Sequence, residues 1–309
     1  MTAHQWTLAD IPDLAGKQAV VTGVTSGIGE KTVLELARAG SRVIMAARNE
    51  SKLRATVDDL KRTLPSAELV PLVVDLADLS SIRRAADEAA QLGPIDILIN
   101  NAGVMATPFS RTVDGFELQF GTNHLGHFAL TGLLFPQLAA ADAARVVTVS
   151  SHAHRGARSV PLGDPRHDQR HYRKWTSYAE SKLANLLFAF ELDRRARAAG
   201  TAVTSMGAHP GYAATNLFAH LHAGGVKPVG AIAVGTSRLL GQPAELGALP
   251  SLMAATMPGL PGGSYTGPRG LAEMRGKPTL VSPSRTARDE ALARKLWDIS
   301  EEATRIHFP

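Results

Sequence analysis

The chain of 309 residues contains no cysteine. This absence excludes disulfide bonds, thiolate metal sites and a cysteine nucleophile, and it fits a reducing compartment. The sequence also lacks an apolar run of the roughly 18–20 residues that a membrane span requires. The start of the chain lacks the basic and then apolar pattern of a secretion signal. We therefore expect a soluble, cytoplasmic protein with no membrane anchor.

The chain also lacks a large excess of charge of either sign. Lys and Arg number 33 and Asp and Glu 28, so the formal net charge is +5, and charged residues make up 20% of the chain. The basic residues are scattered, with no long run of like charge and no stripe that alternates with aromatic residues. This pattern argues against a nucleic-acid partner, and the modest positive excess favours an anionic cofactor.

Short apolar runs alternate with longer segments of helical period, which is typical of βαβ units. Strands are expected at residues 18–22, 42–46, 69–74, 95–99, 145–149, 202–206 and 264–266. Helices are expected at residues 27–39, 51–64, 79–92, 115–141 and 178–199. Several strands are almost uninterrupted apolar runs, as expected when helices cover both faces of a parallel sheet. The sequence predicts an α/β fold, namely a doubly wound parallel seven-stranded sheet (Rossmann fold).

The rest of the chain is expected to belong to the same domain, which spans residues 1–309. Residues 212–260 are interpreted as a region that covers the substrate. A C-terminal helical extension at 288–305 has apolar residues at spacings of four and three, at Leu292, Leu296 and Ile299. We interpret it as a packing helix, with a partner-binding helix as the alternative.

A glycine-rich stretch lies between the first predicted strand and its helix, with the sequence Thr22-Gly23-Val24-Thr25-Ser26-Gly27-Ile28-Gly29. Glycine permits positive φ and lets a diphosphate approach the backbone closely. The free N–H groups and the positive end of the following helix then favour the anion. A dinucleotide is expected to bind at Gly23, Thr25, Ser26, Gly27, Ile28 and Gly29; the alternative is a tight turn without a ligand.

The residues at the end of the second strand would determine whether NAD(H) or NADP(H) binds. A carboxylate there would bind a ribose 2′-hydroxyl, whereas an arginine suits a 2′-phosphate. Ala47 offers no acceptor, while Arg48, followed by Asn49, presents a planar fork to a phosphate. We predict NADP(H) rather than NAD(H); a surface arginine that opens the next helix is the alternative.

Two further strand ends are expected near the cofactor. Asp75 could accept a hydrogen bond from the adenine amino group, and Leu76 would supply an apolar wall. The small residues that follow the fourth strand would let the backbone approach the cofactor, at Asn101, Ala102 and Gly103. Asparagine at a strand end is also a common turn former.

Tyr178 and Lys182 lie four residues apart in a predicted helix, so their side chains point the same way. A phenol has a reference pKa of about 10, so it needs a lowered pKa to act as a base near neutrality, and a neighbouring ammonium favours phenolate. Ser151, after the fifth strand, could donate its hydroxyl proton to a substrate oxygen. Ser150 competes for that role.

These motifs, in this order, resemble those of the short-chain dehydrogenases/reductases over about residues 17–217. The interval between Ser151 and Tyr178, together with the sequence His209-Pro210-Gly211, resembles the retinol-dehydrogenase-like branch. Two C-terminal stretches are similar to bacterial members of that branch, at Tyr265–Pro268 and Met274–Gly276.

The resemblance implies a role for each catalytic residue. Tyr178 would be the general acid/base, Lys182 its activator and a ligand of the nicotinamide ribose, Ser151 the carbonyl anchor and Asn123 the fourth member. Both Tyr178 and Lys182 would thus also contact the cofactor. The loop that would contact the nicotinamide amide is implied to include Pro210, Gly211 and Thr215.

Histidines are frequent between Ser151 and Tyr178, at His152, His154, His167 and His171. Such spacings can chelate a metal, but no cysteine and few acidic residues accompany them. We expect no metal and a polar flap at the cleft instead.

The sequence therefore predicts an NADP-dependent oxidoreductase that moves a hydride between the cofactor and a carbonyl or alcohol carbon. Small hydrophobic aldehydes, ketones or alcohols are the expected substrates, and a homodimer is possible. The alternative is a catalytically silent protein that senses NADP(H) and signals to a partner, because fold alone does not determine function.

Overall fold

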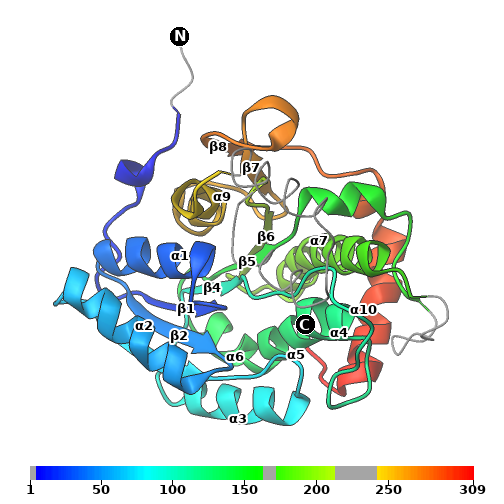
Figure 1. Ribbon diagram of the computed structural model, residues 1–309, viewed down its shortest axis with the longest axis horizontal. Coiled ribbons are helices and arrows are strands. Elements are labelled where there is room, and N and C mark those ends of the chain that lie inside the picture. The colour runs from blue at the N-terminus through cyan, green and yellow to red at the C-terminus, as the bar shows by residue number, and fades with distance from the viewer. Residues whose placement is uncertain (1–4, 163–171, 213–241) are drawn as a thin grey trace, which may run out of the picture.

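A computed structural model describes residues 5–162, 172–212 and 242–309. Its centre is one sheet with the strand order β3-β2-β1-β4-β5-β6-β7-β8 (Figure 1). The first seven strands are parallel. They are β1 (Gln18–Thr22), β2 (Arg42–Ala47), β3 (Leu69–Val73), β4 (Ile97–Asn100), β5 (Arg145–Val149), β6 (Thr204–Ala208) and β7 (Tyr265–Pro268).

The predicted doubly wound parallel sheet is confirmed, but it has eight strands where the sequence indicated seven. β8 (Pro278–Leu280) pairs antiparallel with β7. This strand has only three residues and begins at a proline, so it carries too little apolar periodicity to be recognised from the sequence.

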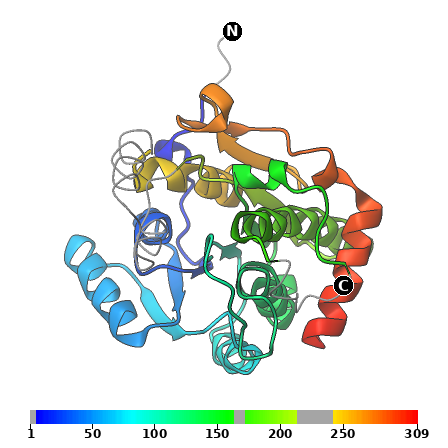
Figure 2. The same cartoon turned by 45° about the vertical axis from the view of Figure 1, so that its right-hand side comes forward.

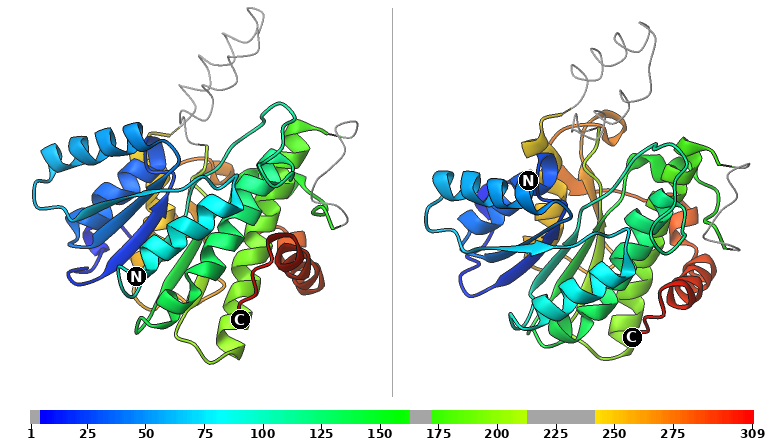
Figure 3. Two further views of the ribbon diagram at one scale, coloured as in Figure 1. Left: turned by 90° about the horizontal axis from the view of Figure 1, so that it is seen from below. Right: turned by 60° about the horizontal axis from the view of Figure 1, so that its bottom comes forward.

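Helices cover both faces of the sheet, as Figure 3 shows. One face packs against α1 (Gly27–Arg38), α2 (Glu50–Thr63) and α9 (Ala244–Thr256). The other packs against α3 (Leu79–Ala90), α5 (Gly126–Leu133), α6 (Phe135–Ala139) and α7 (Lys174–Ala198). Strands β1, β4 and β5 are almost entirely buried between the two layers, in agreement with their near-continuous apolar character.

The single helix expected at 115–141 is divided in the structure. A short α4 (Leu118–Phe120) leads into a π-helical turn over Gly121–Leu125, then α5, and α6 follows a break. The Glu117 carboxylate accepts from the backbone N–H groups of Gln119 and Phe120 and starts α4. Pro136 has no N–H to donate to the preceding turn, which separates α6 from α5.

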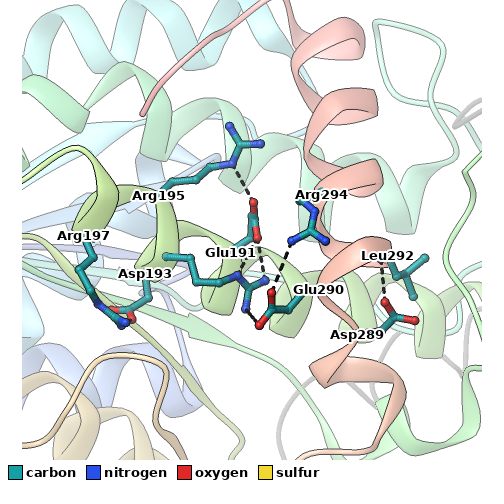
Figure 4. Close-up of polar contacts among 9 residues, drawn as sticks. Glu191, Asp193, Arg195, Arg197, Asp289, Glu290, Leu292 and Arg294 are labelled. Carbon is teal, nitrogen blue, oxygen red and sulfur yellow. Dashed lines mark hydrogen bonds and ion pairs between the residues drawn. The ribbon is translucent and has the colours of Figure 1, made fainter.

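The C-terminal extension is a packing helix, as predicted. α10 (Glu290–Thr304) lies along α7 and buries Ala293, Leu296 and Trp297. Ion pairs surround the contact: Glu191 on α7 accepts from Arg195, and Glu290 on α10 pairs with Arg294 (Figure 4). Arg305 ends α10 in the left-handed conformation.

The region that was expected to cover the substrate, 212–260, is described only in part. Residues 213–241 lie outside the described ranges, and with them Leu217, Phe218 and Leu221, which the sequence offers as candidate apolar walls for the substrate. The described part includes α9, which packs on the sheet beside α1. Within the ranges that are described, no helix is both long enough and apolar enough to cross a bilayer.

Candidate active site

A cavity of about 390 Å³ lies at the carboxyl ends of the central strands, where a doubly wound sheet binds its ligand. Three of the predicted catalytic residues line it together: Ser151 after β5, and Tyr178 and Lys182 on α7. The four-residue spacing on α7 therefore places the phenol and the ammonium on the same side of the helix. They face the end of β5.

Tyr178 is almost completely buried. Burial raises the pKa of its phenol, because phenolate is poorly solvated there, and a side-chain hydrogen bond with Ser151 acts in the opposite direction. The expected lowering of the Tyr178 pKa is thus absent from the protein alone. The contact between the two hydroxyls nevertheless brings together the groups that the sequence paired.

Lys182 is buried against the end of β5. Its Nζ donates to the Val149 carbonyl at 3.1 Å and lies 5.9 Å from the centre of the Tyr178 ring. Burial lowers the pKa of Lys182 to about 8. Near neutral pH the side chain is still mostly protonated, so the cavity holds a positive charge beside the phenol.

The two serines that end β5 are distinguished by their contacts. The Ser150 hydroxyl donates to the Lys182 backbone carbonyl at 2.7 Å and is buried, so it fixes α7 to the strand. The Ser151 hydroxyl lies beside Tyr178, with which it shares a hydrogen bond, and it also accepts from the Ala153 N–H at 3.2 Å. This geometry favours Ser151 as the residue that would contact a substrate oxygen.

Asn123 lies in the π-helical turn, one layer behind the cavity. Its side chain accepts from the Val104 N–H at 2.8 Å and donates to the Val104 carbonyl at 2.9 Å. A Cβ placed on Gly103 would lie 3.1 Å from Asn123 Oδ1 and 3.3 Å from Lys182 Nζ. Asn123 Oδ1 and Lys182 Nζ therefore both lie next to Gly103, so the π-helical turn that carries Asn123 adjoins the candidate site.

The glycine turn after β1 has the conformation that its sequence predicts. Gly23 and Gly27 have φ values of 73° and 60°, which disfavour residues with a side chain. A Cβ on Gly29 would overlap the Gly23 carbonyl, so this position also requires glycine. Of the turn, Ile28 lines the cavity. Thr25 is partly buried and Ser26 exposed.

The segment after β4 closes onto this turn. The Asn101 side chain donates to the Thr22 carbonyl at 2.8 Å, and the Thr22 hydroxyl accepts from the N–H groups of Asn101 and Ala102 at 2.9 Å. Asn101 and Gly103 line the cavity. Small residues here let the two strand ends approach each other.

The residues expected to bind the adenosine half lie on the β2 and β3 side of the sheet. Arg48 is exposed directly after β2. Asn49 caps α2 by accepting from the Lys52 N–H at 2.9 Å. Asp75 is partly buried and accepts from the Ala77 N–H at 2.9 Å, and Leu76 is buried. Asn49 and Asp75 thus have structural partners.

Pro210 and Gly211 also line the cavity, together with a segment that the sequence did not single out as part of the site. Ala272, Glu273 and Met274, which lie between β7 and β8, line the same cavity. Gly270 and Gly276, which flank this segment, are the sequence feature from which a tight turn could have been predicted here. Thr215 lies outside the described residues.

Further lining residues that sequence analysis missed come from other loops and from the start of α7. Beyond His152 of the expected polar flap and Tyr212 at the start of the expected covering region, they are Val104, Met105, Ala153 and Trp175. Their types are unremarkable in sequence, and only the fold brings them together.

Of the described histidines after β5, His152 lines the cavity and His154 has a structural role. His154 is buried; its Nδ1 lies 2.7 Å from the Ser151 carbonyl and its Nε2 accepts from the Ser284 N–H at 3.1 Å. No group of three potential metal-binding side chains occurs in the described part of the chain. His167 and His171 lie outside it.

Comparison with known proteins adds independent information. Residues 17–163 match the family model described as short chain dehydrogenase. Retinol dehydrogenase 14 of Homo sapiens is 40% identical over 303 residues, which cover 93% of this chain and 85% of that protein. Polyprenol dehydrogenase of Mus musculus is 40% identical over 298 residues, which cover 93% and 83%.

Solved structures of similar sequence have the same fold. An uncharacterized protein from Mycobacterium Paratuberculosis is 44% identical, with a TM-score of 0.81 over 99% of this chain and all of that one. A protein described as an NAD(P) dependent gluconate 5-dehydrogenase from Beutenbergia cavernae, with bound NADP, is 27% identical, with a TM-score of 0.61 over 79% of this chain and 91% of that one.

Proposed function

The chain belongs to the short-chain dehydrogenase family, in its retinol-dehydrogenase-like branch, and on that premise we propose that it is an NADP(H)-dependent carbonyl reductase or alcohol dehydrogenase. The single observation that carries this proposal is the convergence of Ser151, Tyr178 and Lys182 on one cavity. A protein that only senses the cofactor has no need of a proton donor beside a hydroxyl anchor.

The proton chemistry follows from the contacts of these side chains. Bound NADP(H) supplies a hydride to a carbonyl carbon or accepts one from an alcohol carbon. In reduction, Tyr178 gives its phenolic proton to the substrate oxygen, which Ser151 holds by a hydrogen bond. Burial keeps Tyr178 protonated and ready to donate. In oxidation the proton moves the other way, and the positive charge of Lys182 favours the phenolate.

Asn123 completes the proposed catalytic group as a positioning residue. It fixes the backbone at Val104 and stands beside Gly103 next to Lys182. We propose that it keeps the lysine at the cavity side of α7. Thr215 is retained as a proposed contact of the nicotinamide together with Pro210 and Gly211.

The proposed cofactor is NADP(H). Arg48 is exposed directly after β2, next to the glycine turn of β1, and Ala47 offers no acceptor to a ribose hydroxyl. The solved relative from Beutenbergia cavernae was described with NADP bound. The proposed dinucleotide path runs from Arg48, Asn49, Asp75 and Leu76 along the glycine turn, past Asn101, Ala102 and Gly103, to the cavity.

The proposed substrates are small hydrophobic aldehydes, ketones or alcohols. The cavity walls include the apolar side chains of Val104, Met105, Trp175 and Met274. The names of the similar proteins, retinol and polyprenol dehydrogenases, describe apolar alcohols. Residues 212–260 are retained as the proposed substrate-covering region.

The absence of cysteine supports a cytoplasmic location. A homodimer, if formed, would not pair through the face of α7 that α10 covers. Light scattering on the purified protein measures the mass directly.

A panel of aldehydes and ketones, assayed by the loss of NADPH absorbance, separates the enzyme from the silent sensor. Turnover of at least one apolar carbonyl compound is the expected result. Tight NADPH binding without turnover across the panel, including the alcohols with NADP, would favour the sensor.

A further inference from the structure

The turn between β7 and β8, residues 270–276, has a conformation that its own sequence does not favour. Ala272 and Glu273 have φ values of 51° and 56°, in the left-handed region that residues with a side chain rarely adopt. The turn is closed by the Gly270 N–H, which donates to the Arg275 carbonyl at 2.9 Å. Surrounding contacts must therefore hold this shape.

Glu273 makes the contacts that hold the turn against the site. Its carboxylate accepts from Arg155 at 3.1 and 3.3 Å, and it lies 3.2 Å from His209 Nε2. Burial lowers the pKa of His209 to about 3, so the ring is neutral and its close contact with Glu273 is not an ion pair. The Glu273 side chain is 24% exposed, and it lines the cavity.

One partner of Glu273 belongs to the loop of the catalytic serine. Arg155 lies in the 3₁₀ turn His152–Gly156 that begins directly after Ser151. Arg155 also donates to the Ser282 carbonyl at 2.6 Å, and His154 ties the Ser151 carbonyl to the Ser284 N–H. The segment 273–284 therefore holds the backbone that carries Ser151.

The other partner belongs to the loop after β6. His209 Nδ1 accepts from the Gly211 N–H at 3.3 Å, and the Tyr212 N–H donates to the Met274 carbonyl at 2.7 Å. A Cβ on Gly211 would lie 2.5 Å from that same carbonyl, so the two segments are in close contact. Figures 1 and 2 show the orange segment that holds β7 and β8 at the opposite end of the molecule from α3, next to β6.

We propose that Glu273 is a positioning residue for the reaction: it joins the Ser151 loop to the Pro210–Gly211 loop and thereby sets the width of the substrate half of the cavity. The inference rests on the proposed function in one respect, because Ser151 matters only if it contacts substrate. Glu273 itself acts through Arg155 and His209 and exchanges no proton with the substrate.

Kinetics of Glu273→Ala and Glu273→Gln test this role. Displacing reacting groups by about 1 Å can cost on the order of a hundredfold, so we expect Glu273→Ala to lower kcat/KM by about 10- to 100-fold. Glu273→Gln keeps an acceptor for Arg155, so its loss should be smaller. The dissociation constant for NADPH should change by less than about threefold, because most of the proposed cofactor contacts, including the glycine turn after β1, lie outside the two loops that Glu273 joins.

Glu191→Gln is the matched control. Glu191 is a buried carboxylate on α7 that also pairs with two arginines, Arg194 and Arg195, away from the cavity. We expect its kcat/KM to stay within about twofold of wild type. Unchanged kcat/KM in Glu273→Ala, or an equal loss in Glu191→Gln, would overturn the proposal.

Hydrogen exchange supplies a readout that does not depend on turnover. Glu273→Ala should speed exchange in peptides that contain residues 151–156 and 210–212, whereas Glu191→Gln should not. Faster exchange in a protein without carbonyl reductase activity would contradict the proposed function and leave the positioning role intact. Unchanged exchange at both loops would contradict the positioning role.

A double-mutant cycle with Arg155→Met asks whether the two residues act as one unit. The double variant should lose less kcat/KM than the product of the two single losses, because both single changes remove the contact between Arg155 and Glu273. Independent, multiplying losses would show that Glu273 does not act through Arg155.

Discussion

At Tyr178, burial and chemistry make opposite demands. Burial raises the pKa of the phenol, which suits a proton donor in carbonyl reduction. Alcohol oxidation needs the phenolate, and the ammonium of Lys182, whose own pKa is lowered to about 8, lies 5.9 Å from the centre of the Tyr178 ring. Because both side chains are buried in one cavity, the charge of Lys182 is weakly screened there. Burial of Tyr178 therefore favours proton donation in reduction, and the charge of Lys182 favours proton acceptance in oxidation.

Arg48 provides a prediction at the scale of one residue. A charge-assisted hydrogen bond to a phosphate contributes about 1.5–3 kcal/mol, so Arg48→Ala should raise the dissociation constant for NADPH about tenfold or more and leave that for NADH unchanged. Fluorescence titration measures both constants.

Arg54→Ala is the control for Arg48, because Arg54 is also exposed but pairs with Glu50 along α2. It should change neither constant. Equal affinity of the wild type for NADH and NADPH, unchanged by Arg48→Ala, would contradict the cofactor assignment.

At the scale of elements, the contact between α10 and α7 stabilises the helix that carries Tyr178 and Lys182. Trp297 on α10 is buried and packs against Phe128, Phe188 and Phe308. The Arg195 guanidinium lies 4.5 Å from the centre of the Trp297 ring. The C-terminal helix therefore supports the site without contacting it.

Trp297→Ala should lower the free energy of unfolding by about 3–5 kcal/mol, because it removes a large buried side chain and leaves a cavity. Urea denaturation monitored by circular dichroism measures the change. Lys295→Ala, on the exposed face of α10, should remain within about 0.5 kcal/mol of wild type. A loss below about 1 kcal/mol in Trp297→Ala would contradict this account of α10.

Elements with strong periodicity were predictable from the sequence. β1 and β5 begin and end at the expected residues, because their apolar runs are bounded by polar residues and turns. The broken helix over 115–141 was not, since its π-helical turn depends on the contacts of Asn123 with a loop 19 residues away in the sequence. The local sequence preferences from which helices are predicted do not include contacts with a residue so far away in the chain.

The same reasoning separates the two halves of the site. Short motifs with a recognisable spacing indicated Ser151, Tyr178 and Lys182, which line one cavity together with Ile28 of the glycine turn. The wall formed by Ala272, Glu273 and Met274 comes from a turn far along the chain, held by residues that are distant in sequence. Such a wall is visible only after the fold has formed.

At the scale of the whole molecule, buried neutral histidines couple stability to pH. Their pKa values are lowered by burial to about 3 or 4, against an ordinary value near 6.5, at His124, His127, His154 and His209. The unfolded chain therefore binds more protons than the folded one below pH 6.5. The contribution of the neutral histidines to the free energy of unfolding is complete above this pH and is lost as the pH falls toward 4.

We expect the melting temperature to be nearly constant between pH 7 and 8 and to fall progressively from pH 6.5 to 4.5. Differential scanning fluorimetry in buffers of constant ionic strength measures it. His124→Asn, which removes one of these imidazoles, should make the acid branch shallower relative to its own value at pH 7.5. A melting temperature that is independent of pH down to 4.5 would contradict the buried, neutral state of the histidines.

The most direct test of the central claim is the rate of Tyr178→Phe with a carbonyl substrate that the wild type reduces, measured beside the NADPH dissociation constant. The substitution removes one hydroxyl and keeps the ring, so binding should stay within about threefold while kcat falls by at least about a thousandfold. A Tyr178→Phe protein that reduces the substrate at the wild-type rate would contradict the proton-donor role on which the account depends.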